Sequence, residues 1–300
     1  MKLINRLAMQ KISNIFSRVS IILIFTFLIV ACSEPEEAPL NLDSSVAVEI
    51  KDDPYGNHSR QILDVYLPAN RSSDRTKLFI WIHGGAWTDG DKSEFVQFKP
   101  WLEAELEDYA FVAVNYRLYN ITTGSNKFPN QEEDIQNMLD YVKSRLNDWD
   151  LSNDVILAGG SAGGHLALLH SYKNNNDGLV KATVAFFPPT DFPTFHGFNF
   201  LTTALIEALI GGTPNSNPTS YANSSPVNFI GTSSIPTVFF HGTADNVVPI
   251  QQSYLLEEKL EEANVPFLNE YIQGGGHGFS QAVNQDLIAK VAVFLKAQIE

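Results

Sequence analysis

Residues 155–165 read Val155-Ile156-Leu157-Ala158-Gly159-Gly160-Ser161-Ala162-Gly163-Gly164-His165, an apolar run that leads through a G-x-S-x-G pentapeptide into a helix-like stretch. A G-x-S-x-G between a strand and a helix forms a nucleophile elbow, which holds the serine on a strained turn with its hydroxyl exposed. Glycines are needed beside the serine because side chains there would collide with the neighbouring strand and helix. The stretch predicts that Ser161 is a nucleophile.

Strand-like and helix-like segments alternate along most of the chain around this elbow. Apolar runs typical of strands covered on both faces are Leu78–Ile82, Phe111–Val114, Val155–Ala158, Ala182–Phe187 and Thr237–Phe240. Two earlier segments, Val46–Ile50 and Gln61–Tyr66, alternate between apolar and polar residues and predict an antiparallel pair. The alternation predicts an α/β fold: a mostly parallel central sheet with helices on both faces and functional sites at the carboxyl ends of its strands.

Residues 191–234 interrupt this alternation. They contain no clear strand, but several aromatic residues and prolines and a short helical piece, Leu201–Ile210. A loop of this length inside a compact domain usually has a function, and phenylalanines at this density would be costly if they were exposed. We therefore expect a short cap insertion over the site, with Phe192 and Phe195, together with Trp87, in contact with the substrate.

A nucleophilic serine needs a base, and the base needs an acid that orients it. Of seven histidines, His277 lies in a glycine-rich loop directly after the strand-like segment Phe267–Ile272. Asp245 follows another buried-type strand by a few residues. The order Ser161, Asp245, His277 is the one expected when a G-x-S-x-G elbow belongs to a catalytic triad. Packing, surface or structural hydrogen-bonding roles are expected for His83, His165, His170 and His241. His58 precedes the core, and His196 is at most a substrate contact.

The segment His83-Gly84-Gly85-Ala86-Trp87 follows the strand Leu78–Ile82. Consecutive glycines allow backbone N–H groups to approach one oxygen, as an oxyanion hole requires. We expect Gly84 or Gly85 to donate from this loop, and Ala162 to donate from the elbow.

Together these motifs resemble the α/β-hydrolase family over about residues 46–300. The likeness is to its esterase branch with an His-Gly-Gly-x-Trp loop, which includes hormone-sensitive-lipase-like and feruloyl-esterase-like enzymes and kynurenine formamidases. Ala86 and Trp87 depart from the lipase-like pattern, in which many members have a third glycine. By resemblance, Tyr116, Arg117 and Asp134 are scaffold residues near the site.

The resemblance implies a serine carboxylic-ester hydrolase of the carboxylesterase type that acts through an acyl-enzyme and needs no metal or organic cofactor. Its substrate would be a small-molecule or glycan-linked ester, with acetyl or feruloyl esters of glycans as one class. Two alternatives stay open. The same fold could cleave amides or peptides, as a formamidase or a prolyl-oligopeptidase-like enzyme does, or it could serve a non-catalytic surface lipoprotein that binds a glycan or a partner. The sequence does not determine the oligomeric state.

The N-terminus has the layout of an export signal. Residues 1–31 contain four basic and no acidic residues, and they include an apolar stretch, 21–30, that is too short for a comfortable membrane span. The segment ends in Ile29-Val30-Ala31-Cys32, which resembles the lipobox of bacterial lipoproteins. We expect a signal peptide (1–31), a lipidated Cys32 with a flexible tether (32–45) and a catalytic domain (46–300). The protein would be exported and anchored to a bacterial membrane, at the periplasmic face or the cell surface. A simple secreted protein with a cysteine at its cleavage site is the alternative.

Removal of residues 1–31 would take away four positive charges and change the net charge from −14 to −18. A field of this sign repels polyanions, so nucleic acid is not an expected partner. Cys32 is the only cysteine, which excludes an internal disulfide.

Overall fold

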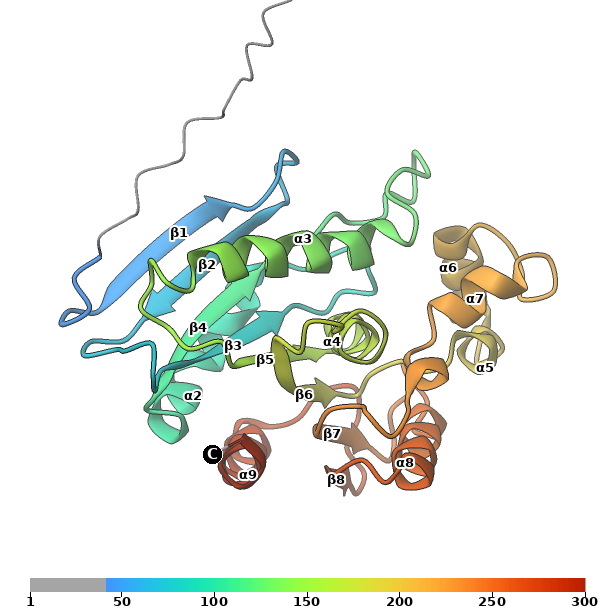
Figure 1. Ribbon diagram of the computed structural model, residues 1–300. Helices are drawn as coiled ribbons and strands as arrows, with labels where there is room; N and C mark the ends of the chain where they lie inside the picture. The colour runs from blue at the N-terminus through green and yellow to red at the C-terminus, as the bar shows by residue number, and fades with distance from the viewer. Residues whose placement is uncertain (1–41, 300) are drawn as a thin grey trace, which may run out of the picture. The chain divides into compact units, whose positions relative to one another are not determined.

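The structure of the protein is a computed structural model that describes residues 42–299, so Cys32 and the predicted signal lie outside the described residues. Its centre is an eight-stranded sheet with the order β1-β2-β4-β3-β5-β6-β7-β8 (Figure 1). The strands are β1 (Val48–Pro54), β2 (Ile62–Leu67), β3 (Lys77–Ile82), β4 (Tyr109–Val114), β5 (Val155–Gly160), β6 (Val180–Phe186), β7 (Thr237–Gly242) and β8 (Phe267–Ile272). β2 runs antiparallel to both its neighbours, β1 and β4, and all other pairs are parallel. The predicted antiparallel opening pair and mostly parallel sheet are confirmed.

Helices cover both faces of the sheet, as predicted (Figure 1). One face is covered by α3 (Asn130–Arg145), α4 (Ala162–Lys173) and α8 (Gln251–Ala263), and the other by α2 (Lys99–Glu105) and α9 (Gln281–Ile299). Alternate residues of β3 serve the two faces: Leu78 and Ile80 pack with α3 and α4, whereas Phe79 and Trp81 pack with α2 and α9. Full burial of each such apolar side chain contributes roughly 1.5–3 kcal/mol, which is why these strands read as continuous apolar runs.

The insertion between β6 and β7 consists of α5 (Phe192–His196), α6 (Phe200–Ile210), α7 (Pro218–Asn223) and the short 3-10 helix η2 (Pro226–Phe229). Figure 1 shows these helices at the end of the sheet where α4 and α8 lie. Their buried apolar side chains, among them Ile206 and Leu209, join the core on the α3 and α4 face. The insertion therefore extends the core along one side.

The strand register brings four loops together at one edge of the sheet. Ile82 of β3 pairs with Gly159 of β5, and the last residues of β5, β6 and β7 continue this line. Gly242 of β7 pairs in turn with Ile272 of β8. The loops that follow β3, β5, β7 and β8 therefore begin side by side at the carboxyl edge, where parallel sheets form their sites.

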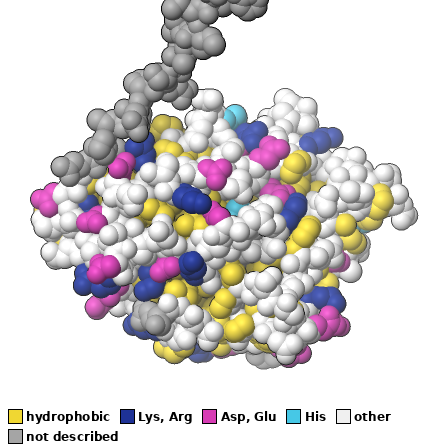
Figure 2. Space-filling model, in the orientation of Figure 1, with side chains coloured by type: hydrophobic (Ala, Val, Ile, Leu, Met, Phe, Trp, Pro, Cys, Tyr) yellow, Lys and Arg dark blue, Asp and Glu magenta, His cyan; other side chains and the backbone are white. Residues whose placement is uncertain are grey.

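Basic and acidic side chains are interspersed on the face seen in Figure 2. Ion pairs among residues 42–299 include Lys143 with Asp177 and Lys173 with Glu132. Opposite charges in an ion pair cancel much of each other's electrostatic field. Within residues 42–299, no helix is both long enough and apolar enough to cross a membrane.

Candidate active site

Ser161 lies on a strained turn between β5 and α4. Its backbone has φ 53° and ψ −120°, a conformation that costs a non-glycine residue about 1–3 kcal/mol. A side chain at Gly163 is impossible here, since its Cβ would lie 2.0 Å from the carbonyl oxygen of Ile82. The elbow is thus fixed between β3 and α4, and the strain presents the Ser161 hydroxyl at the carboxyl edge of the sheet.

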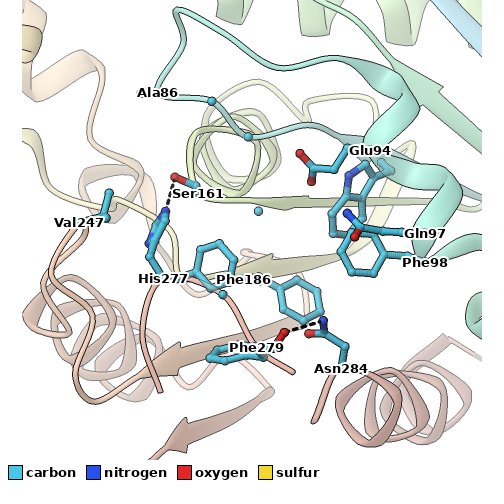
Figure 3. A pocket seen from close by; sticks show the side chains of 16 residues that line it. Ala86, Glu94, Gln97, Phe98, Ser161, Phe186, Val247, His277, Phe279 and Asn284 are labelled. Carbon is cyan, nitrogen blue, oxygen red and sulfur yellow. Dashed lines mark hydrogen bonds between the residues drawn. The ribbon is translucent and has the colours of Figure 1, made fainter. Parts of the chain in front are cut away.

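His277 contacts both of the other predicted triad members. Its Nε2 lies 2.9 Å from Ser161 Oγ, and its Nδ1 lies 2.7 Å from Asp245 Oδ2 (Figure 3 shows the Ser161 contact). An ionised carboxylate only accepts hydrogen bonds, so Nδ1 carries the proton and Nε2 is left to accept from the serine hydroxyl. The three residues come from three different strand ends, and the structure brings them together in the geometry that proton transfer from Ser161 requires.

Asp245 is held ionised by several donors. Burial acts to raise the pKa of this carboxyl, but hydrogen bonds from His241, His277 and the Val247 backbone outweigh burial and place the pKa well below its usual range. Oδ1 accepts from the N–H groups of Val247 at 2.8 Å and Val248 at 3.0 Å. The side chain is inaccessible to solvent. A buried negative charge next to His277 therefore favours the imidazolium that would form when Ser161 loses its proton.

The loop after β3 lies directly above Ser161. A Cβ on Gly84 would come within 3.1 Å of the carbonyl oxygen of Gly160, and Gly85 has φ 106°, which favours glycine. Gly84, Gly85 and Ala86 all line the pocket at Ser161 (Figure 3). Either Gly84 or Gly85 can therefore act with Ala162, the first residue of α4.

The buried side chains of His83 and Tyr116 hold this loop in place. His83 Nδ1 donates to the Gly84 carbonyl at 2.6 Å, so its Nε2 accepts from Arg60 Nη2 at 3.0 Å. Burial lowers the pKa of His83 to about 4, and the neighbouring Arg60 cation contributes. The Tyr116 ring stacks on the imidazole with 4.4 Å between ring centres, and its hydroxyl donates to the His83 carbonyl at 3.1 Å. His83 is therefore a neutral structural residue.

Arg117 and Asp134, the other two predicted scaffold residues, form an ion pair in which Asp134 is buried and Arg117 is partly exposed. Arg117 Nη2 lies 2.7 Å from Asp134 Oδ1, which also accepts from Gln61 at 2.7 Å. The pair ties the segment after β4 to the start of α3, and neither residue lines the pocket at Ser161.

The pocket beside Ser161 has a volume of about 470 Å³ and is lined mainly by aromatic and polar side chains. Sequence reasoning missed most of its walls, namely Trp81, Glu94, Gln97, Phe98, Phe186, Phe187, Val247, Phe279 and Asn284. Two signals were available: Phe279 follows His277 by two residues, and Val247 follows Asp245 by two residues, so each shares a loop with a predicted triad member. The remaining wall residues lie on β3, β6, the 3-10 helix η1 (Lys92–Gln97) and α9, or close to them in sequence. Their orientation depends on the tertiary structure.

Comparison of the sequence with models of protein families identifies the family of this chain. The model of the BD-FAE family matches residues 63–260, a range that includes Ser161, Asp245 and the His83–Trp87 loop. The chain belongs to the BD-FAE family. A relative of this BD-FAE chain is the probable carboxylic ester hydrolase LipM of Mycobacterium tuberculosis, 30% identical over 227 residues that cover 70% of this chain and 51% of LipM. The chain spans about half the length of the curated relatives it matches.

Solved structures share the fold of this BD-FAE chain. A bifunctional GH43-CE protein of Bacteroides eggerthii is 25% identical with a TM-score of 0.71, over 84% of this chain and 38% of that protein. A truncated carbohydrate esterase from gut microbiota is 22% identical with a TM-score of 0.70, over 86% of this chain and 99% of that one. The family match and these structures confirm the predicted α/β-hydrolase fold and the likeness to feruloyl-esterase-like proteins.

The predicted substrate contacts at Trp87, Phe192 and Phe195 are wrong for the BD-FAE chain. All three side chains are buried, at 1%, 0% and 4% exposure, and none lines the pocket. Trp87 and Phe192 pack instead against His165 of α4, with ring centres 5.1 and 4.7 Å from the imidazole. All three lie in the core on the α4 face, where α5 of the insertion packs against α4.

The expectation that the insertion caps the site is corrected for the same reason. The described residues that line the pocket all lie outside 191–234. The lining includes instead Glu94 and Gln97 of η1 and Asn284 of α9. Among residues 42–299, no group of three or more His, Cys, Asp or Glu side chains could hold a metal ion. The hydrogen-bonded arrangement of Ser161, His277 and Asp245 is one that can support nucleophilic attack by a serine hydroxyl, with the imidazole as its base.

Proposed function

We propose that this BD-FAE protein is a serine carboxylic-ester hydrolase that acts through an acyl-enzyme on Ser161. The observation that carries the proposal is the continuous hydrogen-bonded chain from Ser161 Oγ through His277 to Asp245. Ser161 Oγ attacks the ester carbonyl carbon while His277 Nε2 takes the hydroxyl proton. His277 then returns this proton to the departing alcohol oxygen, which leaves the acyl group bonded to Ser161. Water, activated by the same Nε2, attacks the acyl-enzyme and releases the acid.

The charges that form in these steps have partners in the site. The imidazolium of His277 forms next to the ionised Asp245, and the oxyanion forms below the Gly85 loop and Ala162. Loss of one such backbone donor costs on the order of a hundredfold in rate. A non-catalytic binding protein needs neither the strained elbow nor this loop, so the geometry favours the enzyme over the surface-binding alternative.

Acetyl or feruloyl esters of glycans are the substrate class that we propose. The pocket of about 470 Å³ has room for an aromatic acyl group or a sugar ring, and its aromatic walls suit either. Two of the similar structures are named a carbohydrate esterase and a GH43-CE protein, which supports the same class.

The proposal is tested by hydrolysis of p-nitrophenyl acetate. The wild-type protein should cleave this ester, and Ser161→Ala should lower kcat by about 10⁴-fold or more. Ser144→Ala, at an exposed serine of α3, is the matched control and should keep wild-type activity. Equal activity of Ser161→Ala and the wild type would show that the mechanism is wrong.

A substrate panel separates the finer alternatives. Acetyl, butyryl, long-chain and feruloyl esters define the acyl group, and N-formylkynurenine tests amide cleavage. We expect short-chain or feruloyl esters to have the highest kcat/KM. A higher kcat/KM for N-formylkynurenine than for every ester would instead assign the protein as a formamidase.

We also propose that the protein is exported and lipid-anchored through Cys32. The support is the sequence of residues 1–32 alone, which lie outside the described residues. In a bacterium that processes lipoproteins, the wild type should incorporate radiolabelled palmitate and fractionate with membranes. Cys32→Ser should lose both properties, and label retained by this variant would reject the anchor.

A further inference from the structure

The pocket at Ser161 contains one carboxyl side chain, that of Glu94 in η1. Figure 3 shows this carboxyl directed into the open space opposite Ser161. Among the described residues that line the pocket there is no lysine or arginine. An ionised Glu94 therefore faces the substrate space without a cation to neutralise it, and it needs hydrogen-bond donors from whatever enters.

The position of Glu94 is fixed by residues on either side of it. The neighbouring Lys92 is buried and lies 2.6 Å from the buried carboxylate of Asp64. Asp91 caps the start of η1 by accepting from Ser93 N at 2.9 Å, and it also accepts from Asn115 at 2.7 Å. A side chain on an element anchored in this way has a defined direction, as a specificity-determining residue requires.

The carboxyl retains free acceptor capacity. Burial raises the pKa of Glu94, and the neighbouring backbone of Gly84 acts in the opposite direction. A carboxylate has about four lone-pair sites on its two oxygens, so the side chain can accept hydrogen bonds from a bound substrate. Glu94 thus lies beside the oxyanion loop and is open to the pocket.

The other walls have two kinds of surface. Five aromatic side chains form the apolar part, namely Trp81, Phe98, Phe186, Phe187 and Phe279. Gln97 and Asn284 add side-chain amides, each of which both donates and accepts hydrogen bonds. A sugar ring has the complementary character, because its faces are C–H groups and its edges are hydroxyls.

We infer that Glu94 is a substrate-binding residue that accepts a hydrogen bond from a hydroxyl group adjacent to the ester, on a polyhydroxylated alcohol such as a sugar. The inference rests on the proposed esterase function and deepens it. The aromatic walls contact the sugar ring, and the amides of Gln97 and Asn284 contact further hydroxyls. Glu94 accepts a hydrogen bond from the hydroxyl nearest the ester bond.

A cationic group is the other ligand that aromatic rings and a carboxylate could bind. The pocket favours the hydroxyl, because a cation accepts no hydrogen bonds and would leave the side-chain N–H groups of Gln97 without an acceptor. The same holds for the second N–H of Asn284, whose Nδ2 already donates to the Phe279 carbonyl at 3.3 Å.

The test uses two pairs of acetate esters that differ in one feature each. trans-2-Hydroxycyclohexyl acetate and cyclohexyl acetate differ by one vicinal hydroxyl, and acetylcholine and 3,3-dimethylbutyl acetate differ by one positive charge. The wild-type protein should prefer the hydroxylated ester by about tenfold in kcat/KM, the size of one hydrogen bond to a charged group. Glu94→Met should reduce this ratio to about one. Glu105→Gln, at an exposed glutamate at the end of α2, should leave it unchanged.

The outcomes distinguish this inference from the proposed function. Hydrolysis of both cyclohexyl esters with equal kcat/KM, or a ratio that survives in Glu94→Met, would overturn the role of Glu94 while the esterase assignment stands. A preference for acetylcholine that depends on Glu94 would replace the hydroxyl with a cation. A wild-type protein that cleaves none of the four esters, and whose Ser161 a fluorophosphonate does not label, would reject the esterase function itself.

Discussion

Two histidines lie on opposite sides of the sheet near its carboxyl edge, and each contacts its own group of aromatic side chains. On the α4 face, Trp87 and Phe192 enclose His165, which is fully buried; we refer to these three residues as the closed cluster. On the opposite side lies the open pocket, lined by His277 and the aromatic residues around Ser161, where the His277 side chain is 19% exposed. The two groups have similar composition, and they differ in whether the insertion fills the space beside them. An unfilled space next to a nucleophile can admit a substrate, whereas the filled one contributes stability.

Substitution of the two histidines should separate activity from stability. His277→Gln removes the base and should lower kcat by about 10³- to 10⁴-fold or more, with little effect on folding. His165→Gln should keep kcat within a few fold, but it perturbs the hydrogen bond from Nε2 to the Ser224 carbonyl at 2.8 Å and should cost about 1–3 kcal/mol of stability. Steady-state kinetics and urea unfolding measure the two effects. A folded His165→Gln protein as inactive as His277→Gln would erase the distinction.

Truncation of one aromatic side chain in each group should also separate the two effects. In the closed cluster it should mainly lower stability, and in the open pocket it should mainly weaken substrate binding. Trp87→Ala leaves a large cavity in the closed cluster and should lower the free energy of unfolding by about 3–5 kcal/mol. Phe98→Ala opens the wall of a pocket that is already exposed, so it should cost about 1 kcal/mol and act mainly by raising KM for large esters. Thermal unfolding and a KM series provide the readout. Equal destabilisation by both changes would mean that the pocket is packed as tightly as the core.

Acid should destabilise the protein through buried histidines outside the open pocket. Burial lowers the pKa of His83, His165 and His170 to about 4, below the ordinary value of 6.5. As the pH falls, these histidines are therefore protonated in the unfolded chain before they are protonated in the folded protein. The free energy of unfolding should decrease between pH 6.5 and pH 4, by up to about 3 kcal/mol for each histidine. The raised pKa of Glu94 acts weakly in the other direction. Urea midpoints at pH 7.5, 6 and 5 should decrease in that order, and His170→Gln should flatten the slope. A constant midpoint over this range would contradict the burial of these groups.

The smallest effect is expected at the exposed end of the insertion. Phe200 at the start of α6 is 83% exposed. Phe200→Ser should therefore change stability by less than about 0.5 kcal/mol and leave kcat/KM for p-nitrophenyl acetate unchanged. A large change in either quantity would show that the insertion takes part in the site after all.

The sequence was sufficient to predict the three residues of the proposed triad and the mostly parallel sheet. Ser161, Asp245 and His277 each follow a recognisable strand, and parallel strands end at a common edge, so their meeting could be predicted from chain order. The glycine loop after β3 could be predicted for the same reason. The sequence left the choice between Gly84 and Gly85 open, because it depends on the direction of each N–H in the folded loop.

The walls of the pocket could not be predicted, for a physical reason. In a strand covered on both faces the residues are apolar throughout, so the sequence of β3 does not reveal that Trp81 and Ile82 point to opposite sides. The aromatic residues of the insertion suggested substrate contacts by their type. Their burial was decided by how α5 packs against α4, which no local pattern encodes.

Activation of Ser161 by His277 can be tested by the intact mass of the protein after reaction with a fluorophosphonate, followed by peptide mapping. The geometry predicts a single adduct, located on Ser161 and formed at a much lower rate in His277→Gln. An unmodified wild-type protein, or an adduct on any other serine, would show that Ser161 is not the activated nucleophile.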